Sequence, residues 1–373
     1  MQIKIEKLIY GGAGLARTEE GVVFVHRTAP GDVLEVELVE RKKDYANARI
    51  IKLLEPSADR QTPTCPNYQN AGCCHWQHIQ YARQVEYKDA ILRETLQRAG
   101  RITWEKDIAH ITGPDLAYRL RASFHVRDHR LGFVRARSSV VVPIDECSAL
   151  VPELNDWIPE ANKIIVNETE VDAVAAAGGP VASTLKPSAP ARLEVNGFIY
   201  DVHPDAFFQS NRFLLDAFMN EVLDQAGAAP KYVLDLYCGS GFFSMPLAKR
   251  STELIGLEAS RTAVKAARRN AKLNEISNAE FYEGNVDATL KDADIRPDLV
   301  VLNPPRTGCG KDTAAKIAEL YAPRVVYVSC NPSTFAREAT AFLAKGYQLD
   351  RITLIDQFPN TYHIEMAAEF ALR

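Results

Sequence analysis

Hydrophobic and polar residues alternate in short runs along the first 56 positions of the chain. Turn-forming residues, including Gly11-Gly12 and Pro30-Gly31-Asp32, separate these runs. Several short strands at regular spacing predict a small barrel of the OB type, a fold that often binds nucleic acid. The predicted strands lie around Ile3–Leu8, Gly21–Val25, Val33–Val39 and Asn47–Leu54.

The middle of the chain, residues 57–200, combines a helical and a strand-like pattern. Residues 82–101 have the spacing of an amphipathic helix, which we expect to pack on the C-terminal part of the protein. Residues 118–142 alternate in polarity on both sides of a turn at Asp128–Gly132, which predicts a β-hairpin with one polar face. We therefore expect three domains, formed by residues 1–56, 57–200 and 201–373.

In the last part of the chain, buried strands alternate with amphipathic helices. This alternation predicts an α/β fold with an open, mostly parallel sheet and helices on both faces. The runs Leu349–Gln357 and Glu365–Leu372 have no helix between them and predict a closing antiparallel hairpin. This Rossmann-like arrangement suits an S-adenosylmethionine-dependent methyltransferase better than a dinucleotide dehydrogenase. The earlier predicted strands are Val233–Tyr237, Glu253–Leu257, Glu280–Tyr282, Leu299–Leu302 and Arg324–Val328.

Composition narrows the class of protein without naming a function. The 373 residues are 46% hydrophobic and 25% charged, which excludes a disordered, collagen-like or disulfide-scaffold protein. The net charge is −4, so any nucleic-acid binding must come from a local patch. No run approaches the roughly 20 apolar residues that span a bilayer, and the first residues lack the apolar core of a signal peptide. We expect a cytoplasmic protein without membrane association, and a monomer.

A candidate cofactor site follows the first strand of the predicted sheet. Val233–Tyr237 leads into a Gly-x-Gly turn at Gly239 and Gly241, and ligands of open α/β sheets bind at such strand ends. Glu258 ends the next strand, about 20 residues further on, where a carboxylate can bind two ribose hydroxyls. Two phenylalanines follow Gly241 in place of a full phosphate-binding fingerprint, which favours S-adenosylmethionine over a pyrophosphate cofactor.

Two later strand ends carry unusual residues and should reach the same rim of the sheet. Asn303-Pro-Pro-Arg306 closes the fourth strand, and Cys330 follows the fifth strand. A free cysteine is often a small buried residue. The place of Cys330, beyond a strand end and before a helix start, also suits an accessible thiolate. The residues alone leave both interpretations open.

Taken together, the residues resemble the RNA (uracil-5-)-methyltransferase family, especially its ribosomal-RNA members, over almost the whole chain. Gly11–Arg17 and Gly21–Val25 are similar to the family's TRAM domain, a small RNA-binding barrel. The other motifs that carry the resemblance are Phe207–Asn211, the nucleophile loop Ser329–Thr334 and the general-base segment His363–Glu365.

The resemblance implies a covalent mechanism. Cys330 would add to carbon 6 of uracil, so that carbon 5 becomes nucleophilic enough to attack the methyl group of S-adenosylmethionine. Glu365 would then remove the proton from carbon 5, and the cysteine would leave. The resemblance assigns cofactor contacts to Gln209, Tyr237, Glu258 and Asn285, and we add Gly239 of the glycine turn and Asn303 of the later strand end.

The chain departs from the family pattern at Asn303, where the family usually has an aspartate before Pro-Pro-Arg. An amide keeps an acceptor oxygen for the ring N–H of uracil but carries no charge. Asn-Pro-Pro is also typical of methyltransferases that act on amino groups. Those enzymes usually have an aromatic residue next, where this chain has Arg306, and their chemistry would leave Cys330 and Glu365 unexplained.

The second departure concerns cysteines that resemble the family's iron–sulfur ligands. The family's Cys-Gly-Gly-Cys is Ala71-Gly72-Cys73-Cys74 in this chain. Four thiols remain, the number that a [4Fe–4S] cluster needs, and we expect that cluster. A zinc site, or no metal, stays open because adjacent cysteines can both bind only with a distorted backbone. The predicted ligands are Cys65, Cys73, Cys74 and Cys147.

A run of arginines in the predicted hairpin is the candidate RNA-binding surface. Alternate positions on a strand share one face, where guanidinium groups could bind phosphates and stack on splayed bases. The plain alternative is a solvated strand face. The arginines are Arg119, Arg121, Arg127, Arg130, Arg135 and Arg137.

The sequence therefore predicts an enzyme that methylates carbon 5 of a specific uridine in RNA, with 23S ribosomal RNA as the expected substrate. Transfer RNA is the alternative substrate, because similar architectures act on it. Amino-group methylation is the alternative chemistry. A protein of another class, which binds RNA without catalysis, is the remaining hypothesis, and the pair Cys330 and Glu365 argues against it.

Overall fold

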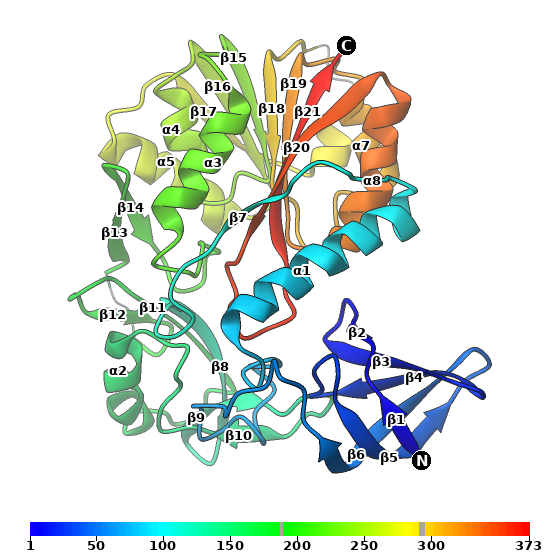
Figure 1. The fold of residues 1–373 in the computed structure, drawn as a ribbon. Helices are drawn as coiled ribbons and strands as arrows, with labels where there is room; N and C mark the ends of the chain where they lie inside the picture. The colour runs from blue at the N-terminus through cyan, green and yellow to red at the C-terminus, as the bar shows by residue number, and fades with distance from the viewer. Residues whose placement is uncertain (187–188, 291–294) are drawn as a thin grey trace.

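The structure is a computed structural model that describes residues 1–186, 189–290 and 295–373. Figure 1 shows an N-terminal barrel, a central group of short strands, and a large twisted sheet flanked by helices. Within these residues, no helix is long and apolar enough to cross a membrane.

The N-terminal barrel is a six-stranded sheet in the order β1-β5-β6-β4-β3-β2, as the regular spacing of short strands predicts. Its strands pair antiparallel except for β4 and β6, which are parallel. A small core of aliphatic side chains, including Ile5, Val25 and Leu34, fills it. The strands are β1 (Gln2–Lys4), β2 (Lys7–Leu8), β3 (Ala13–Thr18), β4 (Gly21–His26), β5 (Val33–Arg41) and β6 (Tyr45–Glu55).

A long helix connects the barrel to the large sheet. Helix α1 (Tyr81–Thr95) continues as the π-helical segment η1 (Leu96–Gly100), which ends at Arg101 in a left-handed conformation. Figure 1 shows α1 running between the barrel and the helices of the large sheet. A Cβ atom at Gly100 would lie 2.4 Å from the carbonyl oxygen of Ala336, so only glycine allows this close approach to α8 (Pro332–Ala344).

The central region contains a five-stranded antiparallel sheet in the order β10-β9-β8-β11-β12. The predicted hairpin is present as β8 and β9, but Arg135–Val140 form a turn before a third strand, β10. Helix α2 (Pro152–Asn162) covers this sheet. The strands are β8 (Arg121–Arg127), β9 (Arg130–Val134), β10 (Val141–Pro143), β11 (Glu170–Ala175) and β12 (Val181–Ser183).

The large sheet has eight strands in the order β17-β16-β15-β18-β19-β21-β20-β7. Strands β15 to β19 are parallel, and β21 is antiparallel to both of its neighbours, so the predicted closing hairpin is confirmed. The edge strand β7 comes from the middle of the chain and pairs parallel with β20. The strands are β7 (Ala109–Ile111), β15 (Tyr232–Leu236), β16 (Glu253–Glu258), β17 (Ala279–Glu283), β18 (Leu299–Leu302), β19 (Arg324–Ser329), β20 (Tyr347–Ile355) and β21 (Glu365–Leu372).

Helices cover both faces of this sheet, because successive strand residues point to opposite faces and both faces are apolar. Val301 packs into the core that contains α3, α4 and α5, and its neighbour Val300 packs into the core that contains α1, α7 and α8. The remaining helices are α3 (Leu215–Ala226), α4 (Ser244–Ala248), α5 (Arg261–Leu273), α6 (Val286–Leu290) and α7 (Lys311–Ala318).

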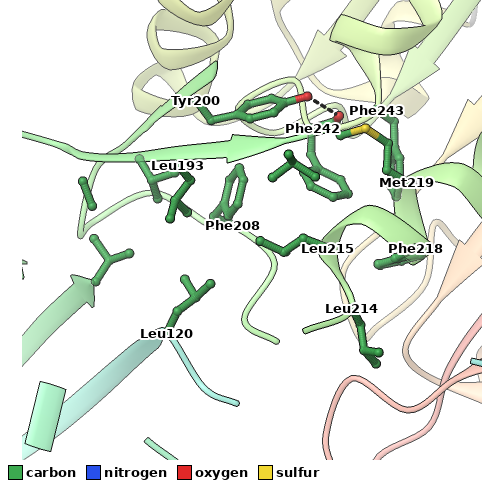
Figure 2. Close-up of a cluster of buried hydrophobic side chains, with 14 of the residues drawn as sticks. Leu120, Leu193, Tyr200, Phe208, Leu214, Leu215, Phe218, Met219, Phe242 and Phe243 are labelled. Carbon is green, nitrogen blue, oxygen red and sulfur yellow. Dashed lines mark hydrogen bonds between the residues drawn. The ribbon is translucent and has the colours of Figure 1, made fainter. Parts of the chain in front are cut away.

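A two-stranded hairpin, β13 (Ala191–Val195) and β14 (Phe198–Val202), joins the central region to the large sheet. The hydroxyl of Tyr200 donates a hydrogen bond of 2.9 Å to the carbonyl oxygen of Phe242, as Figure 2 shows. Phe208 packs between these two rings, with ring centroids 5.5 Å and 5.4 Å away. This packing holds the backbone on either side of Phe208 at the rim of the sheet.

Candidate active site

The turn after β15 is shaped to approach a ligand with its backbone. Tyr237, Gly239 and Gly241 all have positive φ angles, of 59°, 55° and 84°. A Cβ atom at Gly241 would lie 2.4 Å from the Cε of Met245, so this position requires glycine. The tight turn brings main-chain atoms to the carboxyl end of the sheet, as the Gly-x-Gly pattern predicts.

Glu258 faces this turn from the end of β16. Its Oε2 accepts a hydrogen bond of 3.1 Å from the main-chain N of Gly239, and its Oε1 accepts one of 2.7 Å from Ser260. These bonds hold the carboxylate at the rim of the sheet, where a ribose-binding group lies in open α/β folds.

Two buried polar groups support the turn from below. Burial raises the pKa of Asp235 to about 7, although the hydroxyl of Ser244 stabilises its carboxylate. The Nδ2 of Asn270, on α5, donates a hydrogen bond of 3.0 Å to the carbonyl oxygen of Ser240. The sequence analysis missed Asn270, whose only signal is an amide on the otherwise apolar face of its helix.

Gln209 follows the anchored Phe208 in the segment between β14 and α3. It is 6% exposed and has no hydrogen-bond partner within residues 1–186, 189–290 and 295–373. Its amide atoms are not among the fully buried polar atoms without a partner, so they remain accessible to a ligand at this position. Asn211, two residues on, donates weakly, at 3.4 Å, to the carbonyl oxygens of Asp356 and Gln357.

The two other predicted cofactor residues lie in different settings. Asn303 follows β18 and is half-buried, and its main-chain N donates to the carbonyl oxygen of Leu236 at 3.3 Å, so it lies beside the cofactor turn. Asn285 is exposed, and its Oδ1 accepts a hydrogen bond of 3.2 Å from the N of Ala288 at the start of α6. Its side chain therefore already stabilises a short helix.

Cys330, Arg306 and Glu365 interact with one another at the ends of β18 and β19 and the start of β21. Burial and the nearby Glu365 raise the pKa of Cys330 to about 11, and contact with Arg306 opposes this rise. Burial raises the pKa of Glu365 to about 8, again opposed by Arg306. Arg306 thus stabilises the anionic forms of both side chains, a role that the sequence analysis did not assign.

Hydrogen bonds of Asn331 fix the loops on which this group depends. Its Oδ1 caps α8 by accepting hydrogen bonds of 3.0 Å from the N of Ser333 and 3.4 Å from the N of Thr334. Its Nδ2 donates a hydrogen bond of 2.9 Å to the carbonyl oxygen of Arg306. One side chain therefore ties the segment after Cys330 to the segment that carries the guanidinium.

The loop before Glu365 is anchored by helix α1. Lys88 and Asp356 form an ion pair of 2.6 Å, and both side chains are fully buried. A second link joins two amides. The Nε2 of Gln84 donates a hydrogen bond of 2.9 Å to the Oδ1 of Asn360, and its Oε1 accepts one of 2.9 Å from the main-chain N of Asn360. Helix α1 therefore sets the position of the loop that leads to the candidate base.

An aromatic cluster lies on this anchored loop. The ring of Tyr362 is 4.5 Å from those of His75 and His363, and 6.2 Å from that of Tyr10, measured between centroids. Burial, followed by the charge of Arg306, lowers the pKa of His363 to about 3, so this ring is neutral at physiological pH. Tyr10 comes from the N-terminal barrel, which therefore reaches the catalytic rim.

The predicted metal ligands share one buried corner without converging on a point. Contact with Cys147 lowers the pKa of Cys73, but contact with Cys74 and burial raise it to about 12. Cys65 packs with Cys74 in a small apolar cluster. Among the residues that the structure describes, no group of three or more His, Cys, Asp or Glu side chains could hold a metal ion. The geometry therefore gives no support to the predicted iron–sulfur cluster.

The predicted RNA-binding arginines divide into two groups. Arg121 is turned inward, with 17% of its side chain exposed, and donates a hydrogen bond of 3.0 Å to the carbonyl oxygen of Pro204. Arg119 donates to the carbonyl oxygen of Arg121 at 2.9 Å. The exposed members are Arg127, Arg130, Arg135 and Arg137, of which Arg130 pairs with Asp145 and Arg137 contacts His26 of the barrel.

Comparisons with known proteins agree with this geometry. Residues 188–370 match the family described as tRNA (Uracil-5-)-methyltransferase, and residues 1–51 match the TRAM domain. The tRNA (uracil-54, C5)-methyltransferase of Pyrococcus abyssi, solved in complex with S-adenosyl-L-homocysteine, has the same fold. Its TM-score is 0.77 at 23% identity, and the match covers 100% of both chains.

Full-length relatives are more similar in sequence. A protein of Aquifex aeolicus named as an uncharacterized RNA methyltransferase is 34% identical, over 99% of this chain and 97% of its own length. The 23S rRNA (uracil(1939)-C(5))-methyltransferase RlmD of Vibrio parahaemolyticus is 30% identical, over 99% of this chain and 95% of its own length. The chain therefore belongs to the RNA (uracil-5-)-methyltransferase family and carries an N-terminal TRAM domain.

Proposed function

We propose that this protein is a cytoplasmic enzyme that methylates carbon 5 of a specific uridine in 23S ribosomal RNA. The observation that carries the proposal is the grouping of Cys330, Arg306 and Glu365 at one rim of the sheet, beside the turn at Gly239. A thiol, a guanidinium and a buried carboxyl are the groups that a covalent attack on uracil and a proton removal need.

S-adenosylmethionine would supply an electrophilic methyl group. The residues that fit it are Gln209, whose amide has no partner in the described parts of the chain, and Glu258, whose carboxylate faces the glycine turn. Asn303 lies next to this turn and can accept a hydrogen bond from the target base. Tyr237, Gly239 and Asn285 complete the proposed cofactor contacts, with Asn285 the least favoured because its side chain caps α6.

Three residues of the protein act on the target uracil in successive steps. Arg306 stabilises the thiolate of Cys330, which forms a bond to carbon 6 and leaves negative charge on the ring. That charge makes carbon 5 nucleophilic, and carbon 5 takes the methyl group. Glu365 then accepts the proton of carbon 5, and the bond between sulfur and carbon 6 breaks to release the thiolate.

The RNA contacts of the central region are assigned to its exposed arginines. Arg127, Arg130, Arg135 and Arg137 can bind phosphates from the surface of the strands and turns on which they lie. Arg119 and Arg121, which donate to main-chain carbonyl groups, are assigned a supporting role. The TRAM barrel lies next to this surface, because Arg137 contacts His26.

Methyl transfer to unmodified RNA tests the proposed reaction. The purified protein, incubated with labelled S-adenosylmethionine and separate 23S rRNA and tRNA transcripts, should form 5-methyluridine in the 23S rRNA transcript only. Labelled 5-methyluridine in tRNA alone would move the substrate to transfer RNA. A labelled methyl group on a base amine would instead support the Asn-Pro-Pro chemistry, and RNA binding without any methyl transfer would support a non-catalytic protein.

We also propose a [4Fe–4S] cluster. This proposal rests on the number and kind of the available ligands and not on the arrangement of the thiols in the structure. Cys65, Cys73, Cys74 and Cys147 are four thiols in one corner, the number of ligands that such a cluster takes. A cluster would have to draw these side chains together.

Anaerobic purification tests the cluster. A cluster predicts brown protein with about four irons per chain, and Cys73→Ala should remove most of the iron. The matched control is Cys309→Ala, which alters a half-buried thiol outside this corner and should leave the iron content unchanged. Colourless protein with one zinc ion, or without metal, would reject the cluster.

A further inference from the structure

A cavity of about 370 Å³ lies where the N-terminal barrel, the end of α1 and the start of α8 meet. Three separate parts of the chain line it, including Tyr10 of the barrel, Thr95 and Arg98 of the helix, and Ser333 of α8. Ser333 comes three residues after Cys330, so their Cα atoms are at most about 11 Å apart. The cavity therefore lies close to the candidate nucleophile.

Tyr10 connects this cavity to the catalytic rim. Its ring packs edge-on against that of Tyr362, and burial followed by the charge of Cys330 raises its pKa to about 12. Its phenol therefore stays neutral. Neither the hydroxyl of Tyr10 nor that of Ser333 has a hydrogen-bond partner within residues 1–186, 189–290 and 295–373, so both are available to a ligand.

The charged wall of the cavity favours an anionic ligand. Glu94 lines it, but Lys7 binds one carboxylate oxygen at 2.7 Å and Arg98 approaches the other at 3.3 Å. Burial alone would raise the pKa of Glu94, but the charges of Lys7 and Arg98 lower it, so the carboxylate is ionised. Its one negative charge faces two positive charges. The side chain of Arg98 is 74% exposed and can reach a phosphate at the mouth of the cavity.

The helical segment that lines this cavity has π geometry and packs closely against α8. The helix changes from α to π geometry at Leu96–Gly100, where it lines the cavity, and such π segments occur frequently at functional sites. The close approach of Gly100 to Ala336 holds this segment against α8.

We propose that this cavity binds a nucleotide of the RNA substrate that flanks the target uridine, with its base on the ring of Tyr10 and its phosphate at Arg98. The proposal rests on the proposed function, because it identifies a second contact for the same substrate. The cavity has the size of a small-ligand site, and its combination of an aromatic ring, free hydroxyls and a cation matches the base, the sugar and the phosphate of a nucleotide.

Substitutions of Tyr10 test the stacking contact. Loss of one base–aromatic stack in Tyr10→Ala should weaken RNA binding by about 5- to 150-fold, whereas Tyr10→Phe keeps the ring, loses only the hydroxyl and should bind much more tightly than Tyr10→Ala. Tyr45→Ala changes another half-exposed tyrosine of the barrel, away from this cavity, and should have no effect. Arg98→Ala should weaken binding and lower the salt dependence by about one phosphate contact.

Fluorescence of RNA that carries 2-aminopurine next to the target uridine tests where the flanking nucleotide binds. Its fluorescence should be quenched on binding to the unaltered enzyme and to Tyr10→Phe, and should stay high with Tyr10→Ala. Tyr10→Ala should raise the KM for RNA by a larger factor than it lowers kcat, because the proposed contact is to a flanking nucleotide.

Two results would overturn the proposal while leaving the proposed function intact: unchanged RNA affinity and quenching in Tyr10→Ala, or a loss of kcat without a change in KM. Absence of methyl transfer by the unaltered enzyme would instead reject the proposed function.

Discussion

Cys330→Ala is expected to abolish methyl transfer and to form no covalent complex with RNA. The proposed reaction begins with the bond between the sulfur of Cys330 and carbon 6, and no other side chain in the group with Arg306 and Glu365 can replace a thiolate. Cys309→Ser is the matched control, because the thiol of Cys309 contacts Glu338 at 3.2 Å and takes no part in the proposed reaction. A Cys330→Ala enzyme that remains active would overturn the mechanism.

Glu365→Gln should fail at a different step. Bond formation to carbon 6 and transfer of the methyl group both precede proton removal, so this variant should stall as a methylated covalent complex. Denaturing gel electrophoresis should reveal a slow band that contains protein, RNA and the labelled methyl group. RNA with 5-fluorouridine at the target should trap the unaltered enzyme in the same way, because fluorine cannot leave as a cation. Full turnover by Glu365→Gln would exclude this carboxylate as the base.

The rate of release should depend on pH through Glu365. Only the carboxylate form can accept a proton, and burial raises the pKa of Glu365 to about 8 against the opposing charge of Arg306. The rate should therefore rise nearly tenfold per pH unit below about pH 8 and then flatten. The decay of the methylated covalent complex, followed after a single turnover between about pH 6 and about pH 9, checks this because attack by Cys330 is already complete. A flat profile of that decay would contradict the assignment.

Lys88→Ala is expected to lower the free energy of unfolding by about 3–5 kcal/mol, the usual cost of leaving a buried charge without its partner. Lys88 and Asp356 are both fully buried, and the Nζ of Lys88 also donates a hydrogen bond of 3.0 Å to the carbonyl oxygen of Phe358. Urea unfolding followed by circular dichroism measures the loss.

Two controls separate this effect from a general effect of losing a lysine. Lys163→Ala removes an exposed ion pair with Glu160 and should cost no more than about 1 kcal/mol. The double variant Lys88→Met with Asp356→Leu replaces both charges by apolar groups and should recover most of the stability. A Lys88→Ala variant as stable as Lys163→Ala would show that Asp356 tolerates its loss.

The large sheet could be predicted from the sequence because most of its strands are buried apolar runs, and helices separate the parallel ones. The edge strand β7 could not, since Ala109–Ile111 is only three residues long and mostly exposed, without any periodic pattern. Its strand conformation comes from pairing with β20, more than 200 positions later in the chain.

The residues of the candidate site also fall into those that the sequence could predict and those that depend on contacts between distant segments. Cys330, Glu258 and Asn303 follow strands whose carboxyl ends meet at one rim, so their proximity follows from the topology. Arg306 and Tyr10 could not be assigned, because the orientation of a guanidinium and the docking of a barrel depend on contacts between distant segments. Alternation placed Arg121 on the polar face of β8, but it gave no indication that Pro204 covers that position.

The ion pair between Lys88 and Asp356 also constrains how the chain is made, because its two members are 268 positions apart. At roughly 5–20 residues per second, a ribosome needs on the order of 13–54 seconds to travel from one codon to the other. Throughout that interval, the carboxylate that pairs with Lys88 has not yet been made. The N-terminal barrel has its own core and does not depend on this pair, whereas Lys88 can take its final place only after Asp356 has been added to the chain.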